Sequence, residues 1–332
     1  MPLNTVDKAH WVNPEIRVNY YLNNQQTFEL NLNKLRQLKQ RDYWTKKEVN
    51  YLSFNDLKGS TKHIYSRYLM PLPLIRELRA LPFYKNYRDL HSIIDFLLPF
   101  NHLPSDIADV KFPLYYGEHG DTDALPIIRK ARKLTDQHSM LYDFRSLRYN
   151  TPCLEVNKHD IPWSNKKKDV VWRGATTGQI KREAFVTNYH DRYNVGFSTA
   201  KQKPHLAEMI KPRITIADQL KSQFIVSLQG NDLASNIRWV LFSNSVPIMP
   251  KPEWTSWTME EKLEPFVHYL ELDGDLTNLD ELLTWADNHP RECEQIAQNG
   301  KSYVSQFLDK RHDTQVRMMF LEEYAKRVNV IE

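Results

Sequence analysis

Two short stretches in the second half of the chain constrain its fold more than any other feature. Residues 169–178 read DVVWRGATTG, and residues 224–238 read FIVSLQGNDLASNIR. Each passes from an apolar run through a turn with glycine and small polar residues into a helical stretch. Glycine makes up only 9 of 332 residues, against roughly 7% in an average protein, so Gly174, Gly178 and Gly230 are informative. Unpaired N–H groups at a helix start attract anions, and glycine lets a ligand approach. We therefore predict two strand–turn–helix units that bind phosphate.

The same half of the chain alternates strand-like and helix-like segments. We predict strands at 170–172, 193–197, 224–228, 246–249 and 267–272, and helices at 181–189, 216–221, 236–243, 279–288, 290–298 and 314–328. Pro290 marks the start of one helix and Gly300 its end. Alternation at this spacing is typical of a parallel sheet covered by helices. Ligands of such sheets bind outside the carboxyl ends of the strands, where both glycine turns are expected.

The first half is predicted to be mostly helical up to about residue 110. Leucines at helical spacing (Leu32, Leu35 and Leu38, and again near 74–81) support this, and 108–116 resembles a strand. The stretch 157–168, with Pro162 and three successive lysines, is the most linker-like part of the chain. A chain longer than about 300 residues usually forms more than one domain. We predict an N-terminal domain over 1–160, a second domain over 161–312 and a C-terminal helix over 313–332 that packs back on the first.

The residue totals exclude several classes of protein. Apolar residues make up 41% and charged residues 26%, as in soluble globular proteins, and no run approaches the roughly 20 apolar residues of a membrane span. The N-terminus shows no basic-then-apolar leader, which favours a cytosolic protein. Cys153 and Cys293 cannot form a disulfide framework. We expect them to be buried free thiols, with a single bridge as the alternative.

Charge is distributed unevenly. Residues 34–89 carry 13 Lys and Arg against 5 Asp and Glu, a net charge of +8, interleaved with aromatic residues. Residues 259–294 carry 11 acids against 2 bases, a net charge of −9. Both segments fit solvated helix faces. The basic segment also fits a surface for an anionic partner such as lipid headgroups, nucleic acid or an acidic glycan.

A set of motifs resembles glycosyltransferase family 90. The motifs are WRGATTG at 172–178, GND at 230–232, SNIRW at 235–239, SNS at 243–245 and His268-Tyr269. The resemblance covers roughly 126–308 and is faint before about 110. It implies an α/β fold of GT-B type, with two Rossmann-like domains and a cleft between them. It also implies inverting, metal-independent transfer from a UDP-sugar, with no cofactor and with the donor site in the second domain.

The resemblance assigns the donor site to residues of both glycine turns. These are Arg173, Gly174, Thr176, Thr177, Arg182, Gly230, Asp232, Ala234, Ser235, Asn236 and Arg238. A metal-free enzyme must neutralise a diphosphate leaving group with arginine, hydroxyls and backbone amides. Arg238, about two turns into a helix that is expected to start at 234–236, has the planar donor fork for this task and is expected to face phosphate and not the core.

Other interpretations apply to several of these residues. Arg173 fits a structural ion-pair partner as well as a phosphate ligand. Thr176 and Thr177 also fit helix caps, and Lys181 is the alternative to Arg182 as the second cation. His268 fits a packed histidine better than a catalyst, and Trp254 and Trp257 fit core or lid aromatics better than sugar platforms.

The base that takes the proton from the acceptor hydroxyl is an aspartate of the first domain in this family. Asp121 is the closest counterpart, with Asp123 as the second choice and Glu118 as the third. Asp121-Thr122-Asp123 is also a D-x-D motif, which in metal-dependent GT-A glycosyltransferases holds Mg²⁺ or Mn²⁺. That motif is common by chance, and the phosphate-binding turns lie downstream, so we predict no metal site.

The expected function is transfer of a sugar from a UDP donor to a hydroxyl of a bacterial surface glycan such as lipopolysaccharide core. Eukaryotic members of the family are secretory, carry disulfides and end in retrieval signals, whereas this chain ends Asn-Val-Ile-Glu. We therefore expect a cytoplasmic bacterial enzyme with a peripheral contact to the anionic inner face of the inner membrane. The rival is a non-catalytic protein that binds nucleic acid through the basic segment, which matches no recognised nucleic-acid motif. The sugar, the linkage and the oligomeric state are not determined by the sequence.

Overall fold

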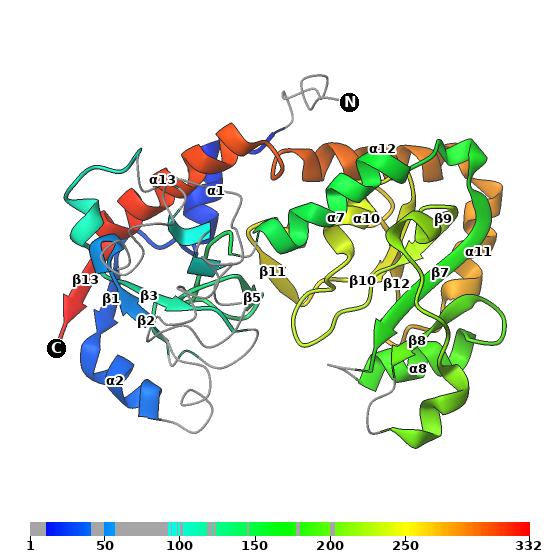
Figure 1. The fold of residues 1–332 in the computed structure, drawn as a ribbon, viewed down its shortest axis with the longest axis horizontal. Helices are drawn as coiled ribbons and strands as arrows, with labels where there is room; N and C mark the ends of the chain where they lie inside the picture. Colours follow the sequence, from blue (N-terminus) through cyan, green and yellow to red (C-terminus); the bar gives the residue numbers. More distant parts are fainter. Residues whose placement is uncertain are drawn as a thin grey trace, which may run out of the picture. The chain divides into compact units, whose positions relative to one another are not determined.

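The computed structural model describes residues 11–40, 50–56, 92–93, 95–97, 99, 102–117, 122, 124–144, 146–176, 180–199 and 203–332 (Figure 1). The chain divides into two compact units. The central unit comprises Met1–Trp11 and Arg148–Asp309, and the terminal unit comprises Val12–Leu147 and Lys310–Glu332. The division thus falls after residues 147 and 309, whereas the sequence places the domain boundaries after 160 and 312.

A five-stranded parallel sheet forms the middle of the central unit. Its strands are β7 (Lys167–Ala175), β8 (Asn194–Thr199), β9 (Ser222–Val226), β10 (Val246–Pro250) and β12 (Leu270–Leu272), in the order β12-β10-β9-β7-β8. Numbered along the chain, this is the 2-1-3-4-5 order of a doubly wound sheet. The strand order therefore reverses between β7 and β9, and the predicted parallel sheet is confirmed.

Helices surround this sheet. They are α7 (Ser146–His159), α8 (Ile180–Tyr189), α9 (Ile216–Gln219), α10 (Ile237–Leu241), α11 (Leu279–Asn288) and α12 (Pro290–Ser305), with short 3₁₀ segments η6 (Trp163–Asn165), η7 (Pro204–Met209) and η8 (Glu260–Lys262) and the strand β11 (Trp254–Ser256). Strand residues such as Val170, Phe224 and Ile248 share one buried core with Phe185 of α8 and Ile296 of α12. Val171 and Ile225, on the opposite face, are 1% and 0% exposed. Both faces of the sheet are thus covered, which explains why its strands are nearly continuous apolar runs.

Two segments of the central unit differ from the prediction. The stretch 157–168 is no linker, because it contains the end of α7, η6 and the start of β7. Lys166 in its lysine run is only 5% exposed and donates to Asp160 Oδ1 at 2.5 Å and to the carbonyl of Leu220. Helix α12 runs past Gly300 to Ser305. A Cβ at Gly300 would lie 3.0 Å from Leu241 Cδ2, so this glycine allows close packing and does not end the helix.

The terminal unit is built on smaller sheets. A four-stranded sheet has the order β2-β3-β4-β6, from β2 (Asn50–Leu52), β3 (Phe112–Tyr115), β4 (Ile128–Arg129) and β6 (Met140–Leu141), with β2 antiparallel and the others parallel. A separate parallel pair joins β1 (Phe28–Asn31) to β13 (Val328–Ile331). The remaining elements are α1 (Pro14–Tyr21), α2 (Leu32–Gln40), η5 (Ile107–Asp109), β5 (Ala131–Lys133) and α13 (Lys310–Arg327).

Helix α13 lies along α1 in the terminal unit (Figure 1). Aromatic side chains dominate the core there: Phe96 stacks on Phe54 with ring centroids 4.5 Å apart, and Tyr324 contacts Phe28 at 4.9 Å. Leu35 and Leu38 of α2 are buried, which confirms that predicted helix. The mostly helical prediction up to about residue 110 is corrected by β1 and β2, whereas β3 confirms the strand predicted at 108–116. The leucines near 74–81 and most of the basic segment lie outside the described residues.

Buried charges link the helices of the terminal unit. Arg317 of α13 donates from Nη2 to Asp143 Oδ2 at 2.6 Å and from Nε to Asp313 Oδ2 at 2.7 Å. Arg17 of α1 lies 3.6 Å from the same Asp313 carboxylate. Although burial opposes it, the charges of Asp143 and Asp313 raise the pKa of Arg317. These arginines are therefore neutralised by carboxylates inside the unit.

Candidate functional site

The turns after β7 and β9 emerge at the point where the strand order reverses. The chain leaves β7 through α8 towards β8 on one side, and it leaves β9 through α10 towards β10 on the other. Since β7 and β9 are parallel neighbours, both turns lie at the same edge of the sheet. Ligands of doubly wound sheets bind at this position. The structure therefore brings the two predicted glycine turns together.

Gly174 makes room for a tryptophan. A Cβ at this position would lie 2.3 Å from Cζ2 of Trp172, whose buried indole covers the glycine on the same side of β7. Ser198 of β8 donates to the carbonyl of Gly174 at 3.1 Å. Glycine is therefore required at position 174 because the Trp172 indole packs against it. The sequence instead predicts that this glycine allows the close approach of a ligand.

Arg182 of α8 joins the two turns. Its Nη1 donates to the carbonyl of Ala175 at 3.1 Å, and its Nη2 and Nε donate to the carbonyls of Leu228 and Gln229 at 2.7 and 2.9 Å. Its guanidinium carbon lies 5.7 Å from the centre of a Trp172 ring. Burial lowers its pKa to about 10, so the side chain stays charged at neutral pH.

Gly230 completes this arrangement. A Cβ there would lie 3.0 Å from Nη2 of Arg182, tighter than most real contacts. The Gly230 N–H donates to the carbonyl of Asp232 at 3.2 Å, which closes the turn. Gly174 and Gly230, two of the three informative glycines, therefore make room for Trp172 and Arg182. The feature of the sequence that could have indicated the Trp172–Arg182 pair is Trp172, which directly precedes Arg173-Gly174.

Arg238 is buried, contrary to the expectation that it faces away from the core. It is 4% exposed, and its guanidinium carbon lies 4.4 Å from the ring centre of Trp257 and 5.7 Å from that of Tyr149. Nη1 donates to Asn150 Oδ1 of α7 at 2.7 Å. The sequence missed Tyr149 and Asn150, because nothing local connects α7 with α10.

The start of α10 also differs from the prediction. The helix begins at Ile237, so Arg238 lies in its first turn, and residues 234–236 precede it. Asn236 does not cap the helix with its side chain: Nδ2 donates to the carbonyl of Val226 at 2.9 Å, and Oδ1 accepts from Ser227 Oγ at 2.9 Å. Asn236 therefore fixes the end of β9 to the turn.

The remaining turn residues lie around these contacts. Asp232 and Ala234 are buried, Ser235 is exposed and Thr176 is half-buried. Thr177 and Gly178 lie outside the described residues. The contact of Thr176, Asp232, Ala234 and Ser235 with a ligand stays a prediction.

Arg173 points away from this edge of the sheet. Its Nη2 donates to Asn194 Oδ1 at 2.7 Å, Nη1 donates to the Asn194 carbonyl at 2.7 Å, and Nε donates to the carbonyl of Pro212 at 3.0 Å. Arg173 pairs in register with Gly196, and Asn194 lies two residues earlier on β8. The guanidinium thus reaches back along β8. This favours a structural role for Arg173 over phosphate binding, although its partners are neutral groups and not the carboxylate of an ion pair.

Lys181, the alternative cation, is more exposed than Arg182. Its Nζ lies 3.1 Å from Glu253 Oε1, and the two side chains are 43% and 55% exposed. An exposed pair of this kind contributes little to stability, so an anion can replace Glu253 at low cost. Arg182 is held by carbonyls, and the choice between Lys181 and Arg182 for direct contact with phosphate stays a prediction.

His268 is hydrogen-bonded and packed. Its Nδ1 accepts from the Glu264 N–H at 3.0 Å, and its ring meets Tyr303 edge-on at 5.3 Å. Burial lowers the pKa of His268, which keeps the ring neutral. The prediction of a packed histidine is confirmed. Trp254 and Trp257 are likewise buried, as expected of core aromatics.

The candidate bases Asp121 and Asp123 lie outside the described residues, as does Glu118. Thr122 between the two aspartates is buried, and its hydroxyl lies 3.2 Å from Ser139 Oγ, which donates to Asp136 Oδ2 at 2.6 Å. Ala124 has a φ of 60°. The assignment of the base therefore stays a prediction.

Three further observations concern the described part of the chain. No group of three or more His, Cys, Asp or Glu side chains could hold a metal ion there. None of its helices combines the length and apolar character needed to cross a membrane. Cys153 and Cys293 are free and buried, which confirms the predicted thiols.

Comparison with known proteins gives one family and several relatives. The model of glycosyl transferase family 90 matches residues 143–331. O-glucosyltransferase LpsA of Dichelobacter nodosus is 29% identical over 220 residues, which cover 64% of this chain and 66% of the relative. Protein O-glucosyltransferase 1 of Homo sapiens is 20% identical over 171 residues, 50% of this chain and 43% of the relative. Protein O-glucosyltransferase 2 of Danio rerio is 24% identical over 163 residues, which cover 47% of this chain and 32% of the relative. The chain thus spans less than two thirds of the length of each of these relatives.

Proposed function

The chain belongs to glycosyltransferase family 90, and from this premise we propose that it is an inverting glycosyltransferase that moves a sugar from a UDP-sugar to a hydroxyl of a bacterial surface glycan. The central unit binds the donor, and its sheet is the nucleotide-binding half of a GT-B architecture. The names of the relatives make glucose the first sugar to test.

One observation carries this proposal: Arg182 connects three carbonyls of the two turns at the point where the strand order reverses. Because carbonyl oxygens are neutral partners, the guanidinium keeps its positive charge while holding the turns in place. Preorganised charge of this kind stabilises a departing diphosphate. Arg182 is therefore a positioning residue whose field also favours the anion.

Arg238 and Lys181 complete the cationic side of the proposed donor site. Arg238 lies on Trp257 with one neutral hydrogen-bond partner, Asn150, and Nε and Nη2 are its remaining donors. Lys181 exchanges Glu253 for phosphate. With three cations around the two turns, the proposal requires no metal ion and no further cofactor.

The chemical step follows from an inverting displacement. The acceptor oxygen attacks C1 of the donor sugar from the face opposite UDP and forms the new glycosidic bond. The bond between C1 and the diphosphate oxygen breaks, and its electron pair leaves with UDP. The proton of the acceptor hydroxyl passes to the carboxylate of Asp121, with Asp123 as the alternative base.

For the acceptor we propose a hydroxyl of lipopolysaccharide core, with the enzyme in the cytoplasm at the inner membrane. The name of the bacterial relative LpsA and the basic segment 34–89 support this assignment. Reversing the charges of Lys46, Lys47, Arg76 and Arg79 is the test of membrane contact, because polybasic attraction to anionic lipid depends on charge and salt.

A donor screen tests the function directly. Release of UDP is measured with UDP-glucose, UDP-galactose, UDP-xylose and the N-acetyl forms, in parallel with binding of UDP alone by calorimetry. Hydrolysis of one donor well above the others, together with UDP binding, is the expected result. Binding to none of them, while a nucleic-acid duplex binds at moderate salt, would instead support the non-catalytic rival.

A further inference from the structure

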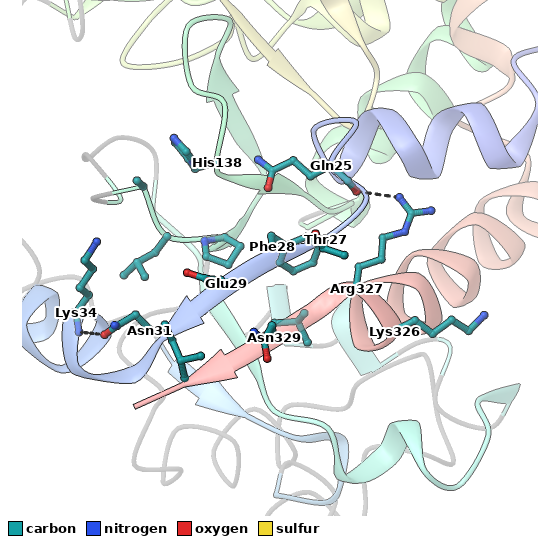
Figure 2. A pocket seen from close by; sticks show the side chains of 15 residues that line it. Gln25, Thr27, Phe28, Glu29, Asn31, Lys34, His138, Lys326, Arg327 and Asn329 are labelled. Carbon is teal, nitrogen blue, oxygen red and sulfur yellow. Dashed lines mark hydrogen bonds between the residues drawn. The ribbon is translucent and has the colours of Figure 1, made fainter.

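A pocket of about 760 Å³ lies within the terminal unit (Figure 2). Its walls are the β1–β13 pair, the turn before β1, residues 124–126 and His138. The volume is within the range of small-molecule sites, roughly 300–1,000 Å³. None of the donor-site residues lines it, so the proposed function leaves this pocket without a role.

The strand pair presents polar side chains to the pocket by simple alternation. Phe28 and Leu30 of β1 are 6% and 0% exposed and face the core, whereas Glu29 and Asn31 line the pocket. Glu29 pairs in register with Asn329 of β13, so these two side chains lie on adjacent strands roughly 4.8 Å apart. Figure 2 shows both on the pocket side of the ribbon.

The lining offers unused hydrogen-bonding groups. The side chains of Thr27, Glu29, His138 and Asn329 make no hydrogen bond or ion pair with any described residue. Together they provide a hydroxyl, a carboxylate with two acceptor oxygens, an imidazole with one donor and one acceptor, and an amide with both. A ligand with several hydroxyl groups satisfies such a mixture, because each hydroxyl both donates and accepts.

The charges at the pocket sum to +1, from Lys34, Lys326 and Arg327 against Glu29 and the neighbouring Glu323. Lys326 and Arg327 line it, but both pair with Glu323, at 2.9 and 2.8 Å. Arg327 also donates to Asn19 Oδ1 at 2.9 Å and to the Gln25 carbonyl at 3.0 Å. The other two charged residues of the lining are Lys34, which is positive, and Glu29, which is negative. A net charge of +1 gives only a weak preference for an anion, and the ring of Pro126 adds apolar surface for the C–H face of a sugar.

We propose that this pocket binds a neutral sugar unit of a glycan, as a site separate from the donor turns, through Glu29, Asn329, Thr27 and His138. The inference rests on the proposed function in one respect: the glycan is the acceptor that the enzyme extends. The pocket then binds a sugar unit that is already part of the acceptor, away from the hydroxyl that receives the new sugar. This contact raises the affinity of the enzyme for the glycan.

The test uses saturation-transfer NMR on the full chain with maltotriose and lactose as neutral probes and glucose 6-phosphate as the anionic probe. We expect transfer to a neutral probe that 0.5 M NaCl leaves unchanged. Asn329→Ala removes a hydrogen-bonding partner, and Glu29→Gln replaces one carboxylate acceptor oxygen by an NH₂ donor and removes the charge. Each should raise the dissociation constant roughly threefold to tenfold. Val330→Thr is the matched control, because Val330 is the next residue on β13, is exposed and does not line the pocket.

Three outcomes overturn the proposal: no transfer to either neutral probe, equal binding in the Glu29→Gln and control variants, or salt-sensitive preference for glucose 6-phosphate. Donor hydrolysis is measured on the same samples and separates the two proposals. Glu29→Gln should hydrolyse UDP-sugar like the unmodified chain. Absence of hydrolysis in every sample contradicts the proposed function alone, whereas normal hydrolysis without sugar binding contradicts only the pocket.

Discussion

The central and terminal units both enclose arginine side chains, and two arginines of each unit differ in the charge of their partners. In the central unit, Arg182 donates to carbonyl oxygens and Arg238 to an amide oxygen while it lies on an aromatic ring. In the terminal unit, Arg317 and Arg17 contact the carboxylates of Asp143 and Asp313. Neutral partners leave the positive charge available to an anion, whereas carboxylates cancel it. Under the proposed function, the charges of Arg182 and Arg238 are available to a diphosphate, whereas the Arg317 network of the terminal unit serves stability.

The pKa shifts agree with this difference. Burial alone lowers the pKa of Arg182 to about 10. In contrast, Asp143 and Asp313 raise the pKa of Arg317 although burial opposes them. An anion beside Arg182 would offset the desolvation that lowers its pKa. For Arg317, the carboxylates of Asp143 and Asp313 already do so.

The largest effect is expected for the predicted base, Asp121, on the rate of sugar transfer. If the terminal unit supplies the base and the central unit binds the donor, Asp121→Asn should reduce sugar transfer by roughly two to four orders of magnitude and leave UDP affinity nearly unchanged. Asparagine keeps the shape of aspartate but accepts no proton. Transfer rates and calorimetric UDP binding check this, with Asp123→Asn as the paired variant.

The same phenotype in Asp123→Asn, with a normal Asp121→Asn, exchanges the roles of the two residues. Normal transfer in both variants removes the base from this part of the terminal unit and leaves the donor site untouched.

The next effect concerns stability. Asp143→Asn removes one of the two carboxylates that pair with the buried Arg317 and should lower the free energy of unfolding by about 3 kcal/mol, as for other broken buried pairs. Asp280→Asn breaks the exposed pair with Arg192, whose side chains are 53% and 45% exposed, and should cost at most about 1 kcal/mol. Urea unfolding measures both. UDP affinity should be the same in the two variants, and a loss of UDP affinity in Asp143→Asn would contradict a purely structural network.

Arg238→Ala tests the buried arginine of the central unit. Loss of a desolvated charge contact should reduce transition-state stabilisation by roughly 2–4 kcal/mol. Because Arg238 packs on Trp257, the melting temperature should also fall, which the sequence alone did not predict. Steady-state kinetics and thermal unfolding are measured together. Lower stability with unchanged kinetics would move Arg238 out of the donor site.

Arg182→Lys separates charge from geometry. Lysine keeps the positive charge but cannot reproduce the hydrogen bonds to Ala175, Leu228 and Gln229. If Arg182 positions the turns, turnover should fall roughly tenfold to a hundredfold, nearly as far as in Arg182→Ala. Arg192→Ala is the matched control, because Arg192 follows α8, is 53% exposed and pairs with Asp280 away from the two turns. Near-normal turnover with lysine at position 182 means that only the charge matters.

The smallest expected effect is that of chelation. Since three cationic side chains surround the two turns, turnover should survive EDTA. Activity is measured after dialysis against EDTA and again with added Mn²⁺. Loss of activity that Mn²⁺ restores would favour the metal-dependent alternative at Asp121-Thr122-Asp123.

The sequence by itself determined the local structure of the central unit. Apolar runs, glycine turns and helical periodicity are properties of neighbouring residues, so they identified β7, α8, β9 and α11 within a few positions. They also placed the two turns at one edge of a parallel sheet. The motifs of the same region carried the family assignment, which the match over residues 143–331 shows.

Only the tertiary structure decided what the side chains do. Arg238 finds Asn150 88 positions away, and Arg182 finds Gln229 47 positions away. Such partners depend on strand order and helix packing, which alternation alone does not fix. Lys166 illustrates the same limit: a lysine run suggests solvent, but the fold buries this one against Asp160 and Leu220. Burial and hydrogen bonding are set by residues distant in the chain, and this is why the roles of the site residues required the fold.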